Sequence, residues 1–437
     1  MKKLINKTTL IIPILALAVL CASACSADIP LLPGSAKPQE AVSNLTRQDQ
    51  ENYPLEELSG LVKGNTAFAL DLYQQLAPAD SNLFFSPYSI SSALAMTYAG
   101  AAGETAKEMA QVFHFPQDEN YLHSGFNALG QYLEGLSDLE IPKDQGDPFQ
   151  LNIANAIWGQ KDFHFEQGFL DTLAVNYGAG LRLLDYIQDP EKSRQTINDW
   201  VSDQTQAKIQ DLIPQGAIDS DTRLVLSNAI YFKATWLEPF QESRTEDGPF
   251  YGLDGEVSQV SLMSTGSDSS YLYYDGDGFQ AIALPYVGGE VSMLVLLPDE
   301  GNFADFRSSL APGTLETILG QMSYQPIQLR FPKFEFESEF SLADTLAAMG
   351  MPSAFSGTAD FSRMTGAKDL FISNVFHKAY VGVDEEGTEA AAATAVVMTL
   401  TAAPLDPLQL TVDRPFLFLI RDHQTDTILF LGQVTQP

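Results

Sequence analysis

Side chains that could catalyse a reaction are few in this sequence, and they are not spaced as catalytic groups. No Gly-x-Ser-x-Gly turn presents a serine nucleophile, and both cysteines of the chain, Cys21 and Cys25, lie close to the N-terminus. The five histidines form no His-Glu-x-x-His pattern, and we expect His114 and His123 to be exposed. No glycine-rich run precedes a Lys-Ser or Lys-Thr pair. The sequence therefore predicts a protein that is not an enzyme and that uses no metal or cofactor.

The most unusual segment runs from Asp384 to Val397 and contains four consecutive alanines. Alanine favours helix, so an exposed helix is one interpretation of this segment. The segment has no amphipathic stripe, however, and it lies between two strand-like runs, residues 379–383 and 408–411. As a strand it would place only small or uncharged side chains on one face, namely Thr388, Ala390, Ala392, Thr394, Val396 and Met398. Such a segment is acceptable both as an exposed loop and as a buried central strand.

The elements that must position this segment show helical periodicity early in the chain and strand patterns later. Phe68, Leu72 and Leu76 are spaced four apart, and Ser86-Pro87 predicts a capped helix start. Strands are predicted over residues 223–236, in a hairpin over 279–298, over the alternating residues 327–337, and in a hairpin over 415–433. A helix capped by Ser341 is predicted over 341–349. No repeat or Pro/Gly linker divides residues 55–437, so we expect one mixed α+β domain.

The N-terminus has the pattern of an export signal. Lys2, Lys3 and Lys7 precede an apolar run over residues 10–20, which is short for a membrane span. Two interpretations remain open: the segment ending at Cys25 resembles a bacterial lipobox, whose cysteine is lipidated, and Ala-Ser-Ala also suits simple cleavage. We expect residues 1–25 to be the signal and residues 26–54 a flexible tether. The protein would then be exported to the periplasm, the cell surface through a membrane tether at Cys25, or the extracellular space.

The charge balance excludes some partners. The chain has 24 Lys and Arg against 56 Asp and Glu, a formal net charge of −32. A surface of this sign repels nucleic acid and polyanions such as heparin, and no cluster of basic residues stands out.

Several long motifs, in order, resemble the serpin family over nearly the whole chain after residue 55. They are Asn82-Leu-Phe-Phe-Ser-Pro-Tyr-Ser-Ile-Ser-Ser-Ala-Leu, Thr222-Arg-Leu-Val-Leu-Ser-Asn-Ala-Ile-Tyr-Phe-Lys, the segment Asp384 to Thr394, and Asp413-Arg-Pro-Phe-Leu-Phe-Leu-Ile-Arg-Asp. The resemblance implies a monomeric serpin fold with three β-sheets, about nine helices and an exposed reactive-centre loop. It also implies a suicide mechanism: a target serine protease cleaves the loop as an acyl-enzyme, and the loop then inserts as a central strand and traps the covalent complex.

The resemblance assigns roles to particular residues. The hinge that must insert comprises Glu385, Glu386, Gly387, Thr388, Glu389, Ala390, Ala391, Ala392, Ala393 and Thr394. Ser86, Ser89, Asn228 and His377 match the polar shutter beneath the opening strands, while Lys333 pairs with Glu385 and Trp236 lies beneath the top of the loop. Ordinary core packing is an equally good interpretation of Trp236.

Counting along the loop as the family does places the scissile bond at Thr401–Ala402, with Leu400–Thr401 as the alternative. Thr401 would suit elastase-like or subtilisin-like proteases, whereas Leu400 would suit a chymotrypsin-like pocket. No Lys or Arg occurs between Lys378 and Arg414, which argues against a trypsin-like target. The hinge carries no residue that would stop insertion, although a non-inhibitory serpin with a binding, carrier or structural role remains the alternative.

Overall fold

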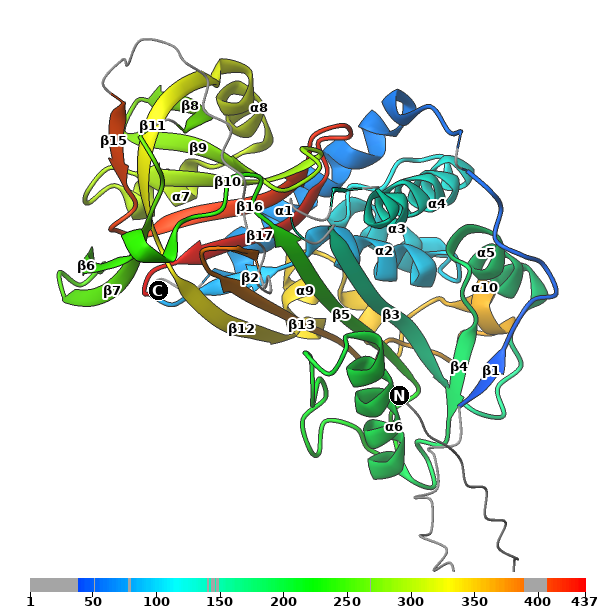
Figure 1. Ribbon diagram of the computed structural model, residues 1–437. Helices are drawn as coiled ribbons and strands as arrows, with labels where there is room; N and C mark the ends of the chain where they lie inside the picture. Colours follow the sequence, from blue (N-terminus) through cyan, green and yellow to red (C-terminus); the bar gives the residue numbers. More distant parts are fainter. Residues whose placement is uncertain are drawn as a thin grey trace, which may run out of the picture. The chain divides into compact units, whose positions relative to one another are not determined.

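The computed structural model describes residues 38–50, 52–77, 80–139, 141–142, 146, 149–267, 269–388 and 407–437. In this part of the chain helices dominate before residue 205 and strands dominate after it, as the sequence predicts (Figure 1). Ten α-helices occur among the described residues, close to the nine expected. They are α1 (Ser59–Leu76), α2 (Pro87–Tyr98), α3 (Gly103–Val112), α4 (Glu119–Gly135), α5 (Gln167–Tyr177), α6 (Pro190–Gln204), α7 (Phe303–Ser309), α8 (Pro312–Gln321), α9 (Ala343–Met349) and α10 (Ser362–Thr365).

The predicted start of α2 is confirmed. Ser86 lies before the helix in an extended conformation, and its side chain accepts a hydrogen bond from the Ser89 backbone N–H. Pro87 occupies the first helical position, where its missing N–H costs nothing. Local residue types therefore fix the point at which the chain enters the core.

A seven-stranded sheet, which we call sheet A, has the strand order β1-β4-β3-β5-β14-β13-β12. Figure 1 labels each of these strands except β14. Its members are β1 (Gln39–Ala41), β4 (Leu181–Leu184), β3 (Gln150–Gln160), β5 (Leu224–Thr235), β14 (Gly387–Thr388), β13 (Asn374–Val383) and β12 (Phe334–Ser341). The central strand β5 is buried at eleven of twelve positions, which is why eight of its twelve residues are apolar.

The other strands form a path of nine with β15 attached. The order is β2 (Leu83–Phe85), β17 (Ile428–Val434), β16 (Phe416–Asp422), β10 (Val291–Pro298), β9 (Phe279–Pro285), β8 (Ser270–Gly276), β11 (Ser323–Pro332), β7 (Val257–Ser264) and β6 (Glu246–Tyr251), while β15 (Leu408–Thr411) pairs with β11. The first part of β11 pairs with β8 and the second part with β7 and β15. The second and third sheets that we expected are thus joined through one shared strand.

Two apolar clusters lie on opposite faces of sheet A. The larger one fills the space between sheet A, the second sheet and helices such as α1 and α2. The smaller one packs α6 and the residues after it against β3, β4, β5 and Phe376 of β13. Sheet A is therefore covered on both faces near its centre, which matters for any strand that must enter it.

Three local predictions were wrong. Residues 327–337 are not one strand, because the chain breaks at Lys333, whose backbone N–H bonds to Ser261 between β11 and β12. Ser341 does not cap α9; it ends β12, and its hydroxyl donates to Asn374. His123 is buried between α4 and α5, with Nδ1 2.8 Å from the Tyr177 hydroxyl, and burial lowers its pKa to about 4.

The predicted flexible tether over residues 26–54 is also wrong where the structure describes it. Residues 39–41 form β1, which extends sheet A by pairing with β4, and Glu40 binds Arg182. Further on, the guanidinium of Arg47 donates to the Asn127 side chain at 2.8 Å and to both oxygens of Glu134 at 2.9 Å. These contacts join the segment to the folded domain, and short polar segments of this kind carry no periodicity that would reveal them.

Candidate functional site: the hinge and the polar cluster of sheet A

The first residues of the predicted insertion segment already form a strand inside sheet A. Strand β14 lies between β5 and β13, with Gly387 opposite Thr235 and Thr388 opposite Ala234. On its other side, Thr388 is opposite Val383. The remaining hinge residues Glu389 to Thr394, the candidate bond at Thr401–Ala402 with its alternative Leu400, and Cys25 lie outside the described residues.

Below β14, strands β5 and β13 pair directly with each other. The pairing is parallel and joins residues 225–230 of β5 to residues 374–379 of β13. We call this line of direct pairing the seam. A longer central strand could enter sheet A only by separating β5 from β13 along the seam. The bonds that join the two strands across the seam therefore affect how readily the sheet opens.

Gly387 is required at its position by the closeness of β5. A Cβ atom on this residue would lie 2.1 Å from the carbonyl oxygen of Ala234, much closer than any real contact. The φ angle of Gly387 is not left-handed, so the reason for glycine is space and not backbone conformation. The side chain of Ala234 itself is accommodated in the core.

Thr388 is fixed by an aromatic pair. Its Oγ1 lies 2.7 Å from the hydroxyl of Tyr286, and both side chains are buried. The ring of Tyr286 stacks on Trp236 at 4.5 Å between centroids and an angle of 9°. Trp236 in turn donates from its indole N–H to the Asp384 carbonyl and from its backbone N–H to the Glu386 carbonyl. Trp236 is therefore both a core residue and a direct support of the hinge.

Glu385 is held by an ion pair and a hydroxyl. The Lys333 ammonium donates to one carboxylate oxygen at 2.6 Å, and the Thr245 hydroxyl donates to the other at 2.6 Å. Burial by itself raises the pKa of this carboxyl, but the bonds from Lys333 and Thr245 outweigh burial and lower the pKa below its usual value. The carboxylate is thus ionised and fixed where the chain turns from β13 towards β14.

Beneath the seam, the four predicted shutter residues meet in one buried polar cluster. His377 and Asn228 are opposite each other across the seam, and His377 Nδ1 bonds to the Asn228 side-chain oxygen. The Asn228 amide donates to the Ser89 hydroxyl at 2.7 Å and to the Asn155 oxygen. The Ser86 hydroxyl donates to the Leu429 carbonyl at 2.6 Å, and its backbone N–H donates to His377 Nε2 at 3.3 Å.

The hydrogen bonds determine the protonation state of His377. Since Nε2 accepts from the Ser86 N–H, the single ring proton lies on Nδ1 and is donated to Asn228. Complete burial lowers the pKa of His377 to about 3, although the hydrogen bond with Asn228 opposes this effect. The imidazole is neutral at physiological pH and acts as a bridge between β13 and β5, not as an acid–base catalyst.

Three contributors to this site were missed from the sequence. Tyr286 directly follows β9 within the predicted 279–298 hairpin, Thr245 directly follows a 3-10 turn, and Asn155 lies on β3 opposite Asn228. Asparagine in the middle of an apolar strand is a signal that could have identified Asn155. Neither Tyr286 nor Thr245 has such a signal, because each reaches the hinge only through tertiary contact.

Comparison with known proteins identifies the class. Residues 63–437 match the family described as Serpin (serine protease inhibitor). An uncharacterised serpin-like protein of Thermococcus kodakarensis is 37% identical over 93% of this chain and 92% of its own length. Leukocyte elastase inhibitor of Bos taurus is 39% identical over 88% of this chain and 100% of its own. The native structure of the thermophilic serpin tengpin has a TM-score of 0.78 at 25% identity, covering 92% of this chain and 100% of that one.

The chain belongs to the serpin family. The predicted fold class is therefore confirmed, and family membership agrees with a protease inhibitor that is not itself an enzyme. Within the described ranges, no group of three or more His, Cys, Asp or Glu side chains is placed to hold a metal ion. Within the same ranges, every helix is too short or too polar to cross a membrane.

Proposed function

We propose that this serpin inhibits serine proteases by the suicide-substrate mechanism, with cleavage at Thr401–Ala402 or at the neighbouring Leu400–Thr401. The protease attacks the loop carbonyl, the peptide bond breaks, and the new amine leaves while the loop stays bound as an ester. The freed loop then enters sheet A along the seam before water can hydrolyse the ester.

The register of β14 is the observation that supports this proposal. Thr388 is opposite Ala234 on β5 and Val383 on β13, and both pairings are antiparallel. Six residues further along the loop, the same two registers place Thr394 opposite Asn228 and opposite His377. Those two residues are themselves partners across the seam.

The side chains of the loop suit this register. Alternate residues from Thr388 onwards are small or uncharged. Thr394, which follows the four alanines, would bring its hydroxyl to the polar cluster described beneath the seam. A threonine there can replace the Asn228–His377 bond that insertion breaks, so the cluster stays satisfied.

The energy released by insertion is sufficient for the mechanism. A strand of about twelve residues adds roughly ten ladder hydrogen bonds, each stabilising by about 1 kcal/mol net. The resulting total of about 10 kcal/mol is comparable with the stability of a folded protease, about 5–15 kcal/mol. Insertion can therefore distort an attached protease enough to trap the ester.

The test is to mix the purified mature protein with pancreatic elastase, subtilisin, chymotrypsin and trypsin, followed by denaturing gels and mass spectrometry. We expect an SDS-stable complex with at least one of the first three, and a released peptide that begins at Ala402. A peptide beginning at Thr401 would assign the alternative bond. Clean cleavage of the loop by every protease, with full protease activity retained, would refute inhibition and leave a binding, carrier or structural role.

Export and membrane attachment form a separate part of the proposal. The N-terminal pattern supports secretion, and Cys25 supports a lipid anchor that would hold the inhibitor at a membrane surface. Metabolic labelling with a fatty-acid analogue in the native host, compared between the natural chain and Cys25→Ser, tests the anchor. Equal labelling of both chains would exclude lipidation at this cysteine.

A further inference from the structure

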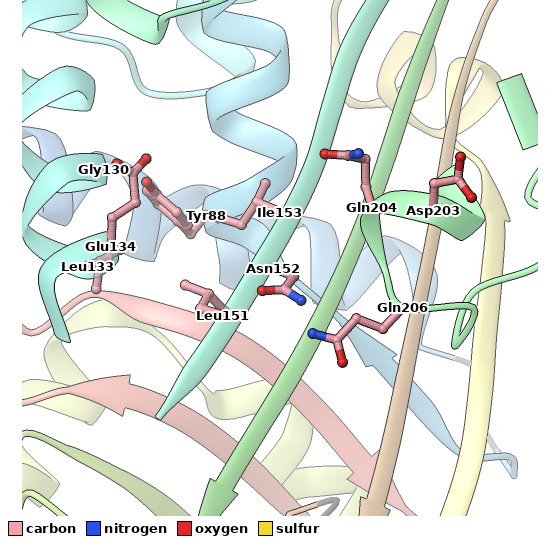
Figure 2. A pocket seen from close by; sticks show the side chains of 10 residues that line it. All are labelled: Tyr88, Gly130, Leu133, Glu134, Leu151, Asn152, Ile153, Asp203, Gln204 and Gln206. Carbon is pink, nitrogen blue, oxygen red and sulfur yellow. The ribbon is translucent and has the colours of Figure 1, made fainter. Parts of the chain in front are cut away.

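A pocket of about 470 Å³ lies beside strand β3, between helix α4 and the end of α6 (Figure 2). Its volume is in the range of sites that hold small molecules, about 300–1,000 Å³. None of the described hinge residues and no member of the polar cluster beneath the seam lines it. The pocket is therefore separate from the residues that the proposed mechanism uses.

Tyr88 of α2 contributes a buried hydroxyl to this pocket. The residue is 3% exposed, and no side chain or backbone group of the described residues bonds to its hydroxyl. A Cβ atom on Gly130 would lie 3.5 Å from the hydroxyl oxygen, so the absence of a side chain at Gly130 leaves space there. Burial raises the pKa of Tyr88, which keeps the phenol neutral. Because a buried hydroxyl without a partner is unfavourable, this group is available to bond with a molecule in the pocket.

The charged residues that line the pocket are both acidic. Glu134 lies on α4 and Asp203 near the end of α6, and Figure 2 shows them on opposite sides of strand β3. Glu134 accepts from the Arg47 guanidinium at 2.9 Å, whereas no described residue pairs with Asp203. The described lining contains no lysine or arginine. In a chain with a net charge of −32, the pocket therefore attracts cations and repels anions.

The remaining lining residues provide apolar surface and neutral acceptors. Leu151 and Ile153 of β3 are half-buried and present hydrocarbon to the pocket. The side-chain amides of Asn152, Gln204 and Gln206 can accept hydrogen bonds through their oxygens. An ammonium group has three donors and no acceptor, so it requires acceptors of this kind. A chain of methylene groups with an ammonium at each end would suit the apolar surface, the amides and the two carboxylates together.

We infer that this pocket binds a linear aliphatic polyamine, with one ammonium at Glu134 and the Tyr88 hydroxyl and another at Asp203. The methylene groups between them contact Leu151 and Ile153. A metal ion fits less well, because the described residues place no group of three His, Cys, Asp or Glu side chains around one point. The inference goes beyond the proposed function, since it involves neither the reactive loop nor a protease.

Titration calorimetry of spermine with the purified mature protein tests the inference. We expect one saturable site that weakens as salt is added, because its main contacts are ion pairs near the surface. Butylamine carries a single ammonium and cannot reach both carboxylates, so it should bind about tenfold more weakly or less. Equal affinities of the two amines would show that the pocket does not recognise a polyamine.

The variant Tyr88→Phe removes the hydroxyl and leaves the charge of the protein unchanged. We expect it to weaken spermine binding about fivefold. Its melting temperature should stay the same or rise, because the deleted hydroxyl has no partner to lose. Weaker binding could then not be ascribed to unfolding. An unchanged affinity would overturn the inference, since attraction by the acidic surface alone does not depend on this hydroxyl.

Two aspartates separate the pocket from the acidic surface in general. Asp203→Asn removes the carboxylate of the pocket, whereas Asp199→Asn removes the same charge at an exposed position of α6 outside the lining. We expect Asp203→Asn to weaken spermine binding about threefold and Asp199→Asn to leave it nearly unchanged. Equal losses in both variants would mean that spermine collects on the negative surface without a site, and the inference would be wrong.

The variant Gly130→Ala tests the place of the ammonium beside Tyr88. The new Cβ would lie 3.0 Å from Arg47 Nη2, which is the end of a flexible side chain and can move. Alanine favours helix over glycine, so the melting temperature should not fall. We expect the narrowed space to weaken spermine binding about threefold or more. The natural affinity in this variant would show that no ammonium reaches the Tyr88 hydroxyl and would refute the assigned geometry.

Discussion

Under the proposed mechanism, replacing Thr388 by arginine should convert the protein from an inhibitor into an ordinary substrate of the protease. Thr388 is 1% exposed, and its hydroxyl lies 2.7 Å from Tyr286 between β5 and β13. An arginine side chain has no room in this position and would bring an unpaired charge beside a buried phenol. The uncleaved variant can avoid this by withdrawing β14 from the sheet, but an inserted loop cannot.

The expected magnitude follows from the burial of the charge. Burying a charged group without a partner costs several kcal/mol, and we take about 3 kcal/mol as the increase in the insertion barrier. Since each 1.36 kcal/mol is a factor of about ten in rate, insertion slows by roughly 100-fold. If insertion in the natural chain is about ten times faster than ester hydrolysis, insertion in the variant is about ten times slower than hydrolysis.

The assay is titration of a fixed amount of protease, with the number of inhibitor molecules consumed per protease inactivated as the readout. We expect about one for the natural chain and about ten or more for Thr388→Arg, with cleaved monomer replacing complex on denaturing gels. Thr317→Arg makes the same change at an exposed position of α8 and should behave as the natural chain does. A natural ratio for Thr388→Arg would show that loop insertion does not require a small, uncharged side chain at this buried position and would refute the argument.

Other substitutions and pH test the remaining contacts. Gly387→Ala places a Cβ against the Ala234 carbonyl, so β14 should detach, and hydrogen exchange of the Thr388 amide should rise at least tenfold. Lys333→Met removes the partner of buried Glu385 and should lower stability by about 2 kcal/mol in denaturant unfolding, whereas an unchanged midpoint would assign the pair no energetic role. The folded-state pKa of His377, about 3, lies below its unfolded value of 6.5. Its contribution is therefore complete above pH 6.5 and should fall by about 1.4 kcal/mol per unit below it, a slope that must be smaller in a folded His377→Gln variant.

Sequence reasoning could predict those parts of the fold that depend on residues close together in the chain. The cap at Ser86, the apolar run of β5 and the hairpins at 279–298 and 415–433 follow from residues close together in the chain. The strand β1 and the break at Lys333 could not be predicted in this way, because three polar residues have no period and the break depends on Ser261 of a distant strand. The burial of His123 likewise depends on Tyr177, 54 residues further along.

For the site, the family motifs identified the residues but not all of their partners. Ser86, Ser89, Asn228 and His377 were predicted to meet, and the structure brings them together. The fact that Gly387 and Thr388 already lie inside sheet A could not be predicted, since an alanine-rich segment fits a loop and a strand equally well. Tertiary contacts, such as those with Tyr286, which lies 102 residues earlier, and with Trp236, determine where the chain enters the sheet.

The occupation of sheet A by β14 has a consequence for crowded solutions of this protein. A gap between two strands accepts any extended chain of suitable side chains, including the loop of a second molecule, and such exchange would link molecules end to end. Here Gly387 and Thr388 of the same chain fill the mouth of the gap: Tyr286 bonds to Thr388, and Trp236 bonds to the carbonyls of Asp384 and Glu386 just before them. An invading loop would first have to displace them, so we expect these two residues to oppose self-association if the proposed insertion takes place.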